Sequence, residues 1–453
     1  MNGPPATERA LSLPAYDDPR TSALLEGDLL HELSYAFGGP FHFLLPDRFD
    51  ANTAAFKAVL EESGTEGRIH YAKKANKAAA WIERCALSGT GVDVASAGEL
   101  REALGHGVRG ENIVVTGPAK AEELLRTAVL QDCLIAVDAP DELERVIALA
   151  GALRPARLLL RRLPPAQEHS RFGFDDAGLE AALLRCREAA DWVRMEGFSF
   201  HLSGYAVQPR ADLAAQLIAL SLRARGLGLQ ADRISIGGGF AVDYVSAGDW
   251  DRFQREQRPE DYHAGKTFPD FYPYHSPVAG ADALRAVLAA TPAGERSTLA
   301  ELLREAGVVL LLEPGRALLD GAGGTVFRVQ GVKARDYGIV TVDGTSLSLS
   351  EQWFNSEFLP DPVLVPGAPT ASGGPFPACV GGASCLESDM LTWRKVPFPA
   401  RPAVGDLLVY PNTAGYQMDS NESPFHDLPL PPKVVVESGG ERPRWRLDRH
   451  PSS

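Results

Sequence analysis

The chain has 453 residues and 45% hydrophobic content, which is sufficient for one large domain and a smaller second one, each with its own core. Its 45 lysines and arginines against 59 aspartates and glutamates give a formal net charge of -14, which repels phosphate backbones and anionic lipid. These values argue against a disordered chain and against nucleic-acid or membrane-surface binding, and they favour a small-molecule partner.

Residues 1–18 lack the basic-then-apolar pattern of a signal peptide, and no apolar run approaches the ~20 residues that a membrane span needs. Five cysteines, an odd number, form no CxxC pair and no Cys/His cluster at zinc-binding spacing. We therefore expect a cytoplasmic protein without a metal site.

Residues 1–45 contain the apolar run PFHFLL, which we expect to supply a strand to a second domain or to lead into a barrel. From residue 68 onward, short aliphatic or β-branched runs alternate with helix-like stretches. There are eight such runs, at residues 68–72, 91–96, 112–117, 134–139, 156–163, 198–204, 233–239 and 308–315. Eight β/α units in series predict a closed (β/α)8 TIM barrel, with a doubly wound open sheet as the alternative.

After Glu313 the chain changes to strand-like runs without helices between them, which predicts an all-β C-terminal domain. The predicted division is an N-terminal segment that contributes to the β-domain, a barrel and a C-terminal β-domain, at residues 1–45, 46–315 and 316–453.

Polar residues and glycines stand where the predicted barrel strands end, which is where such barrels carry their active sites. They are Lys74, Asp93, Ser96, His201, Gly237, Gly238, Gly239, Glu313 and Arg316. Each has an ordinary explanation, such as a glycine-rich turn, a surface salt bridge or a solvated acid. Together they supply the groups that hold pyridoxal phosphate: a lysine nucleophile, glycines and an arginine for the phosphate, an acid and a histidine.

Nine collinear blocks then resemble the fold-type III pyridoxal-phosphate decarboxylases, the group of ornithine and diaminopimelate decarboxylases. The blocks are YAKKAN (71–76), GVDVASAGEL (91–100), SRFGF (170–174), FHLSG (200–204), ISIGGGF (234–240), EPGRALL (313–319), VDGTS (342–346), GGASCLESD (381–389) and GDLLVYPNTAGY (405–416). The resemblance implies a barrel of the alanine racemase type with a C-terminal β-domain, pyridoxal phosphate as cofactor, and a homodimer with shared active sites.

The resemblance also implies roles for individual residues in the barrel. Lys74 would hold the cofactor as a Schiff base, and His201 would stack on its ring. Glu313 would pair with the pyridinium nitrogen and so stabilise the quinonoid that follows loss of CO2. Asp93 and Glu99 match acids near the lysine and the ring, and the phosphate would be surrounded by Gly238, Gly239, Arg316 and Tyr416.

In the C-terminal domain, Cys385 and Asp389 match residues that the family contributes across a dimer interface, the cysteine as the acid that protonates the carbanion. Asp343 matches an acid near the far end of the substrate. Strand alternation allows only one of the neighbouring lysines at the first strand end to face the barrel interior. The motif alignment assigns that place to Lys74, and Lys73 is interpreted as a salt-bridge partner between strand and helices.

Four departures from the family pattern stand out. Ser203 precedes Gly204 where the family has glycine and then serine, so the hydroxyl that would reach the phosphate is displaced. Leu386 replaces an acid that binds the distal amine of diamine-forming substrates, and the run SLSLSEQWF at the end of VDGTS holds no Arg-Pro pair, which disfavours ornithine and diaminopimelate. An aromatic insertion at residues 261–280 predicts a lid or substrate pocket, or a loop packed on the β-domain or a dimer partner.

We therefore predict a pyridoxal-phosphate-dependent carboxy-lyase that acts on an amino acid or an amino-acid conjugate. An amino-acid racemase or epimerase on the same barrel is the second hypothesis, although Glu313 stands where alanine racemases have arginine. The third hypothesis is an inactive homologue that acts as a regulatory binding protein.

Overall fold

The computed structural model describes residues 11–349, 355–368, 374–419, 425–437 and 443–448. These residues form two compact units. The unit called here the β-unit holds residues 11–49, 242–277 and 319–448, and the barrel unit holds residues 50–241 and 278–318.

The barrel unit is built on eight parallel strands that close on themselves. In order they are β2 (Gly67–Ala72), β3 (Gly91–Val94), β4 (Ile113–Val115), β5 (Leu134–Val137), β6 (Ala156–Arg161), β7 (Val193–Ser199), β8 (Arg233–Ser235) and β9 (Val309–Leu312). Closure comes from the pairing of β9 with β2, in which Gly67 faces Leu310 and Ile69 faces Leu312. The predicted (β/α)8 barrel is thus confirmed, and the open sheet is excluded.

Buried aliphatic side chains on several of these strands form one apolar cluster, with members Val114, Leu134, Ala136, Leu159 and Leu311. Parallel barrel strands are covered on both sides, so their sequences are nearly continuous apolar runs rather than alternating ones. Burying each large aliphatic side chain contributes about 1.5–3 kcal/mol.

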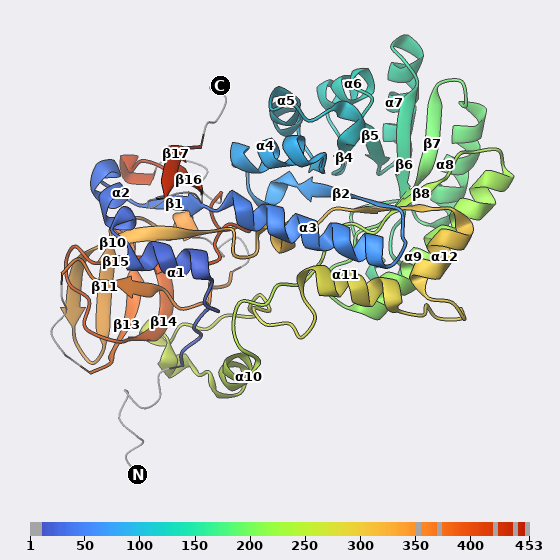
Figure 1. Ribbon diagram of the computed structural model, residues 1–453. Coiled ribbons are helices and arrows are strands. Elements are labelled where there is room, and N and C mark those ends of the chain that lie inside the picture. The colour runs from blue at the N-terminus through green and yellow to red at the C-terminus, as the bar shows by residue number, and fades with distance from the viewer. Residues whose placement is uncertain (1–10, 350–354, 369–373, 420–424, 438–442, 449–453) are drawn as a thin grey trace. The chain divides into compact units, whose positions relative to one another are not determined.

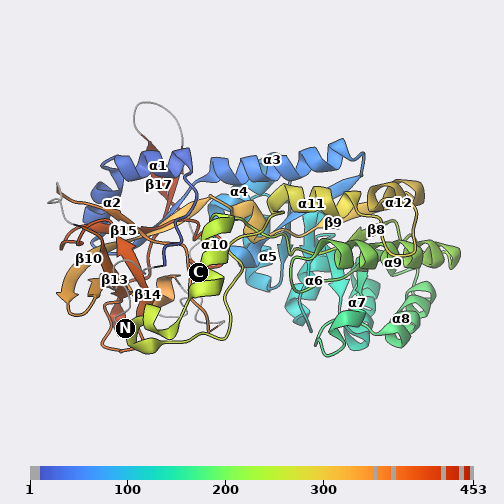
Figure 2. The ribbon, with the colours of Figure 1, turned by 90° about the horizontal axis from the view of Figure 1, so that it is seen from below.

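Helices surround the barrel strands (Figure 1). They are α3 (Pro46–Glu62), which enters this unit from the β-unit, α4 (Ala79–Ser88), α5 (Ala97–Gly105), α6 (Glu122–Leu130), α7 (Pro140–Ala152), α8 (Asp176–Glu188), α9 (Val207–Gly226), α11 (Gly280–Ala289) and α12 (Leu299–Ala306). Figure 2 shows α9, α11 and α12 side by side. Local sequence sets their ends: α12 begins at a reciprocal capping box between Thr298 and Glu301 and ends at Gly307, whose φ is 56°.

The β-unit contains a nine-stranded sheet, whose main path runs in the order β14-β13-β11-β10-β1-β16-β17. Its strands are β1 (Phe41–Leu44), β10 (Gly323–Ala334), β11 (Gly338–Val342), β12 (Val363–Val365), β13 (Phe376–Gly381), β14 (Met390–Phe398), β15 (Leu407–Tyr410), β16 (Lys433–Glu437) and β17 (Arg444–Leu447). Strand β1, from the N-terminal segment, pairs antiparallel with β10 and parallel with β16. Helices α1 (Pro19–Glu26), α2 (Leu29–Phe37) and α10 (Ala247–Glu256) also belong to this unit.

Most of the aromatic insertion belongs to the β-unit rather than to the barrel unit. Buried Tyr274 joins the apolar core of the sheet, and its hydroxyl donates to the Glu357 carbonyl at 3.3 Å. Tyr262 forms an antiparallel bridge with Arg394, and Lys395 Nζ donates to the Glu260 carbonyl at 2.7 Å. These contacts support the interpretation of the insertion as a loop packed on the β-domain.

Over the part of the chain that the structure describes, no helix combines the length and the apolar character that crossing a bilayer would require.

The barrel unit contains a fully buried ion pair next to the barrel strands. Lys120 Nζ lies 3.0 Å from Glu142 Oε2 on α7 and donates to the Ala136 carbonyl at 2.5 Å. The Glu142 carboxylate also accepts the backbone N–H groups of Lys120 and Asp138, at 2.8 and 2.9 Å. Desolvation lowers the pKa of Lys120, and the carboxylate of Glu142 opposes that shift. This network joins the segments that follow β4 and β5.

Lys120→Met should lower the free energy of unfolding by about 3–5 kcal/mol, because it leaves the Glu142 charge buried without a cation. Urea unfolding followed by circular dichroism measures the loss. The matched control is Arg185→Met, which removes an exposed ion pair with Glu144 and should cost less than about 1 kcal/mol. Equal effects of the two substitutions would contradict the assignment of the buried pair as a stabilising link.

Candidate active site

The two neighbouring lysines after β2 have different surroundings. The chain turns at the end of the strand into a 3-10 segment, Lys73–Ala75. Lys73 is buried, with its Nζ 2.5 Å from Glu102 Oε2 on α5. The side chain of Lys74 is 47% exposed, and its Nζ donates to Asp93 Oδ2 at 3.5 Å. Lys73 is therefore the salt-bridge residue between strand end and helix, and Lys74 is the accessible amine.

Asp93 lies on β3 directly beside the end of β2, because Ala72 and Asp93 are partners in the parallel pairing. Its side chain is buried, and Thr116 Oγ1 donates to Asp93 Oδ1 at 2.6 Å. One carboxylate oxygen thus faces the Lys74 amine while the other is held by a hydroxyl. Such an arrangement fixes the orientation of the carboxylate.

Glu313 is the first residue after β9 and is buried. It accepts a hydrogen bond from Ser235 Oγ of β8 at 2.6 Å. Desolvation, followed by the negative charge of Asp93, raises the pKa of Glu313 to about 7. A buried carboxyl group whose pKa is raised in this way is suited to pairing with a protonated nitrogen, because a positive charge next to it would stabilise the carboxylate.

His201 follows β7 and is solvent-exposed at the strand end. Protein atoms around the ring desolvate it, and Lys74 and Arg161 repel a second positive charge, so its pKa falls to about 4. The imidazole is therefore neutral at physiological pH. A neutral flat ring can stack on another aromatic ring without introducing a charge beside it.

The three glycines after β8 lie against the backbone of the other site segments. A Cβ atom at Gly238 would lie 2.6 Å from the Glu313 carbonyl oxygen, and one at Gly239 would lie 2.5 Å from Arg210 Nη2. Gly239 also has a φ of 78°, which disfavours other residues. A side chain at either position would collide with these neighbours, so the packing here requires glycine, and glycine backbone also permits the close approach of a phosphate group. Arg316, half-buried, begins the 3-10 segment Arg316–Leu319 just beyond Glu313.

Several polar residues of this site were not predicted from the sequence. Besides Thr116 and Ser235, Arg161 at the end of β6 lies 3.2 Å from Asp138, which follows β5, and its guanidinium stacks 4.3 Å over the Phe172 ring. All of them stand at carboxyl ends of barrel strands. That position was the available signal, because an isolated serine or threonine has no distinctive chemistry in sequence. Glu99, a predicted neighbour of the lysine, accepts the Ala95 N–H at 2.7 Å in the first turn of α5.

Three predicted residues of the β-unit, Asp343, Cys385 and Asp389, lie in two neighbouring loops. Asp389 is buried, and its carboxylate accepts the backbone N–H groups of Ser346 at 2.7 Å and Ser384 at 3.1 Å. It therefore joins the VDGTS segment to the loop that carries Cys385. A contact of Asp389 with substrate stays a prediction.

Cys385 is exposed in this loop, and its Sγ lies 3.4 Å from His426 Nε2. Asp343 is buried and accepts the Arg328 N–H at 2.8 Å; burial raises its pKa. Tyr416 is half-buried in a turn with a φ of 72°. Non-glycine residues in this conformation are uncommon and concentrate at functional sites.

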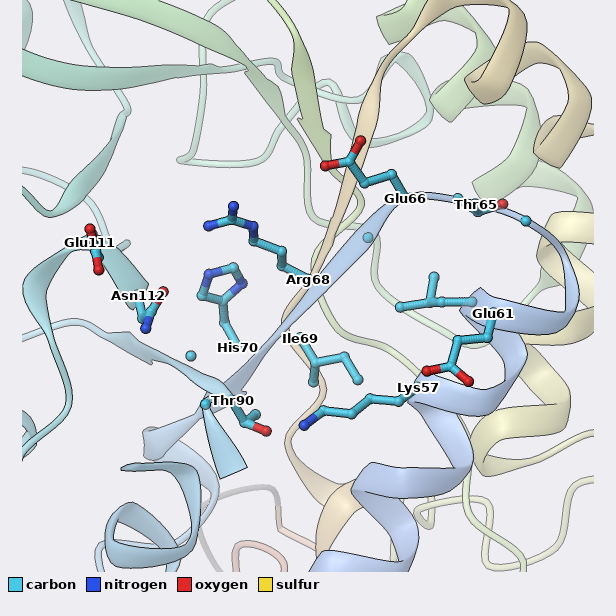
Figure 3. Close-up of a pocket in the computed structure, with 15 residues that line it drawn as sticks. Lys57, Glu61, Thr65, Glu66, Arg68, Ile69, His70, Thr90, Glu111 and Asn112 are labelled. Carbon is cyan, nitrogen blue, oxygen red and sulfur yellow. The ribbon is translucent and has the colours of Figure 1, made fainter. Parts of the chain in front are cut away.

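A cavity of about 860 Å³ opens elsewhere on the barrel unit, at the amino ends of β2 and β3 (Figure 3). It is lined by Lys57, Glu61, Arg68, His70 and other residues, none of which is a predicted site residue. His70 is buried there, and desolvation lowers its pKa to about 4. Because barrel enzymes carry their chemistry at the opposite ends of the strands, we assign this cavity no catalytic role.

Comparison with known proteins agrees with this arrangement. Residues 48–259 match the family model described as "Pyridoxal-dependent decarboxylase, pyridoxal binding domain". An uncharacterized protein of Sinorhizobium fredii, y4yA, is 40% identical over 422 residues, which is 92% of each chain. A diaminopimelate decarboxylase of Actinosynnema pretiosum is 28% identical over 98% of this chain and 94% of its own.

Solved structures share the fold at lower identity. A diaminopimelate decarboxylase from M. jannaschii in complex with L-lysine has a TM-score of 0.72 at 21% identity and covers 93% of this chain and 91% of its own. An arginine decarboxylase from Paramecium bursaria Chlorella virus has a TM-score of 0.67 at 17% identity, over 91% of this chain and 100% of its own. With relatives along nearly its whole length and a barrel whose strand ends fit the cofactor, the chain belongs to the pyridoxal-dependent decarboxylases, carboxy-lyases that use pyridoxal phosphate.

Proposed function

We propose that this protein decarboxylates an amino acid or an amino-acid conjugate. The observation that carries the proposal is the grouping of Lys74, Asp93 and Glu313 at the carboxyl ends of adjacent barrel strands. Pyridoxal phosphate, when bound, supplies an electron sink for the electron pair left by CO2. The chain's own residues hold that group, orient the substrate and move protons.

Lys74 would hold the cofactor through its accessible Nζ, with Asp93 next to the amine as its charge partner. Glu313 would hold a proton at the pyridine nitrogen, because a charge pair there removes the desolvation cost that the buried carboxylate otherwise bears. His201 would stack on the ring in its neutral form. Gly238, Gly239, Arg316 and Tyr416 would contact the phosphate.

Residues of the β-unit would complete the site in a homodimer. The thiol of Cys385 is exposed, which makes it available to a second copy of the chain, and it would deliver the proton that replaces CO2. Asp389 holds the loop that carries this thiol and, with Asp343, would face the substrate. We propose residues 46–315 as the cofactor-binding barrel and residues 316–453 as the C-terminal β-domain, to which residues 1–45 contribute.

The substrate proposed is neither diaminopimelate nor ornithine, although relatives bear the name diaminopimelate decarboxylase. The side chain of Leu386, where the family has an acid for a distal amine, is apolar and half-exposed next to Cys385. The segment directly after Ser346, residues 347–354, contains no Arg-Pro pair to bind a second carboxylate. A substrate with an uncharged or conjugated far end fits these substitutions better.

A screen of amino acids and their side-chain conjugates for CO2 release, with products identified by mass, tests the proposal. Lys74→Ala should abolish release with the best substrate and, after borohydride reduction of the holoenzyme, should eliminate the pyridoxyl label that peptide mapping finds on Lys74. Lys77→Ala, an exposed lysine three residues along, should retain both. A label elsewhere, or turnover without Lys74, would contradict the assigned role.

The raised pKa of Glu313 predicts that the stability of the cofactor-free protein depends on pH. Its pKa is about 7 when folded and 4.5 ordinarily, so within this window the folded state retains a proton that the unfolded chain has lost. Stability from this group is therefore full below pH 4.5 and lost as pH rises through about 7. Urea unfolding should show the advantage of wild type over Glu313→Gln shrinking between these pH values. Glu305→Gln, at an exposed position, is the control for the substitution itself, and the same pH-dependent change in both variants would contradict the assignment to Glu313.

Cys385→Ala should retain cofactor binding, measured by the visible absorption of the holoenzyme, but lower kcat by about 100-fold, because general acid catalysis contributes 10²–10⁴-fold. Product analysis by mass should reveal misdirected protonation. Ser388→Ala, exposed in the same loop, serves as the control. Unchanged products and rate in the Cys385 variant would remove this residue from the mechanism.

A further inference from the structure

A single buried arginine ties together the two loops that follow β7 and β8. Arg210, on the first turns of α9, donates from Nη2 to the carbonyl oxygens of Gly204 at 3.1 Å and Gly239 at 3.2 Å. Its Nη1 donates to the Ile236 carbonyl at 3.1 Å. Only 2% of the Arg210 side chain is exposed, and a Cβ atom at Gly239 would lie almost on the guanidinium. The arginine thus lies directly behind the glycine segment.

Among the residues that the structure describes, no aspartate or glutamate forms an ion pair with this guanidinium, and Tyr205 is the acidic group that opposes its desolvation. Desolvation lowers its pKa to about 10, which still leaves it protonated at neutral pH. Burying an uncompensated charge is costly, and such groups in native proteins are normally paired. The three carbonyl contacts offset part of this cost, and an anion on the other side of the glycine segment would offset more.

The carbonyl contacts also orient the loop backbone. In a trans peptide the C=O and the following N–H point in opposite directions, and the described chain has no cis peptide bonds. Anchoring the Gly204 and Gly239 carbonyls on Arg210 therefore turns the N–H groups of Tyr205 and Phe240 away from it. Backbone N–H groups presented in this way, with a positive charge behind them, form an anion-binding concavity.

We propose that Arg210 is a positioning residue for the phosphate of the cofactor, and that its clamp on the two loops compensates for the hydroxyl displaced by the Ser203–Gly204 order. The inference rests on the proposed placement of the phosphate by Gly238 and Gly239. It goes beyond that placement because Arg210 lies in none of the motif blocks and acts from behind the glycines, through their carbonyl groups and its charge.

The test compares binding of pyridoxal phosphate and of pyridoxal, which lacks the phosphate, to cofactor-stripped protein. Both dissociation constants come from absorbance or fluorescence titration, and their ratio measures the contribution of the phosphate. Arg210→Met should reduce the wild-type preference for the phosphorylated form by about 10- to 100-fold, as expected for losing a charge-assisted interaction, with pyridoxal binding nearly unchanged. Arg210→Lys, which keeps the charge, should lie between the two.

Arg225→Met is the matched control. Arg225 lies at the other end of α9 and donates to three backbone carbonyls in the same way, those of Ala231, Ala306 and Gly307. Its loss should leave the binding ratio at the wild-type value.

The proposal for Arg210 would be overturned if Arg210→Met kept the wild-type ratio of dissociation constants, or if Arg225→Met lowered the preference for pyridoxal phosphate equally. Neither result would contradict the proposed decarboxylase function. If wild-type protein binds pyridoxal phosphate in preference to pyridoxal but releases no CO2 from any substrate, that result would instead contradict the proposed function. Circular dichroism verifies that each variant is folded. If Arg210→Met is unfolded, the binding ratios of Arg210→Gln and Arg210→Lys are compared instead.

Discussion

The pairing of β2 with β9 is the constraint on which the candidate site depends. It closes the barrel and sets Ile69 opposite Leu312, so Lys74, which follows β2, and Glu313, which follows β9, emerge at the same rim. On the other side of β2, the partnership of Ala72 with Asp93 places an acid beside the lysine. Without closure, Lys74 and Glu313 would belong to opposite edges of an open sheet.

Within this rim the titrating groups share one physical influence. Desolvation disfavours charge, so it raises the pKa of the acid Glu313 and lowers that of the base His201. Both pKa shifts reduce the charge that these two side chains carry, while Lys74 and Asp93 keep a close contact. A ligand with a cationic ring nitrogen would offset the desolvation of Glu313, and Arg210 behind the glycine segment would attract an anionic phosphate.

The sequence was sufficient for the barrel because its eight apolar runs are short, regularly spaced and strongly periodic. It was sufficient for Lys74 only through the motif alignment, since the choice between two adjacent lysines depends on Glu102 on α5, a contact that spacing does not reveal. Arg210 and Arg161 were not predicted for a similar reason: their partners are backbone carbonyls, or an acid on another strand, brought near only by the fold. Interpretation of the aromatic insertion likewise required the sheet on which it packs.

The place of β1 in its sheet bears on how the chain can fold during synthesis. This strand comes from the N-terminal segment, yet its two partners are β10 and β16, which are made much later. The barrel is similarly incomplete until β9 is available to pair with β2. Both units are therefore rich in contacts between distant parts of the chain, a topology that folds slowly and exposes apolar strand edges while translation continues. Nascent chains of this protein would need protection from aggregation until nearly the last strand has left the ribosome.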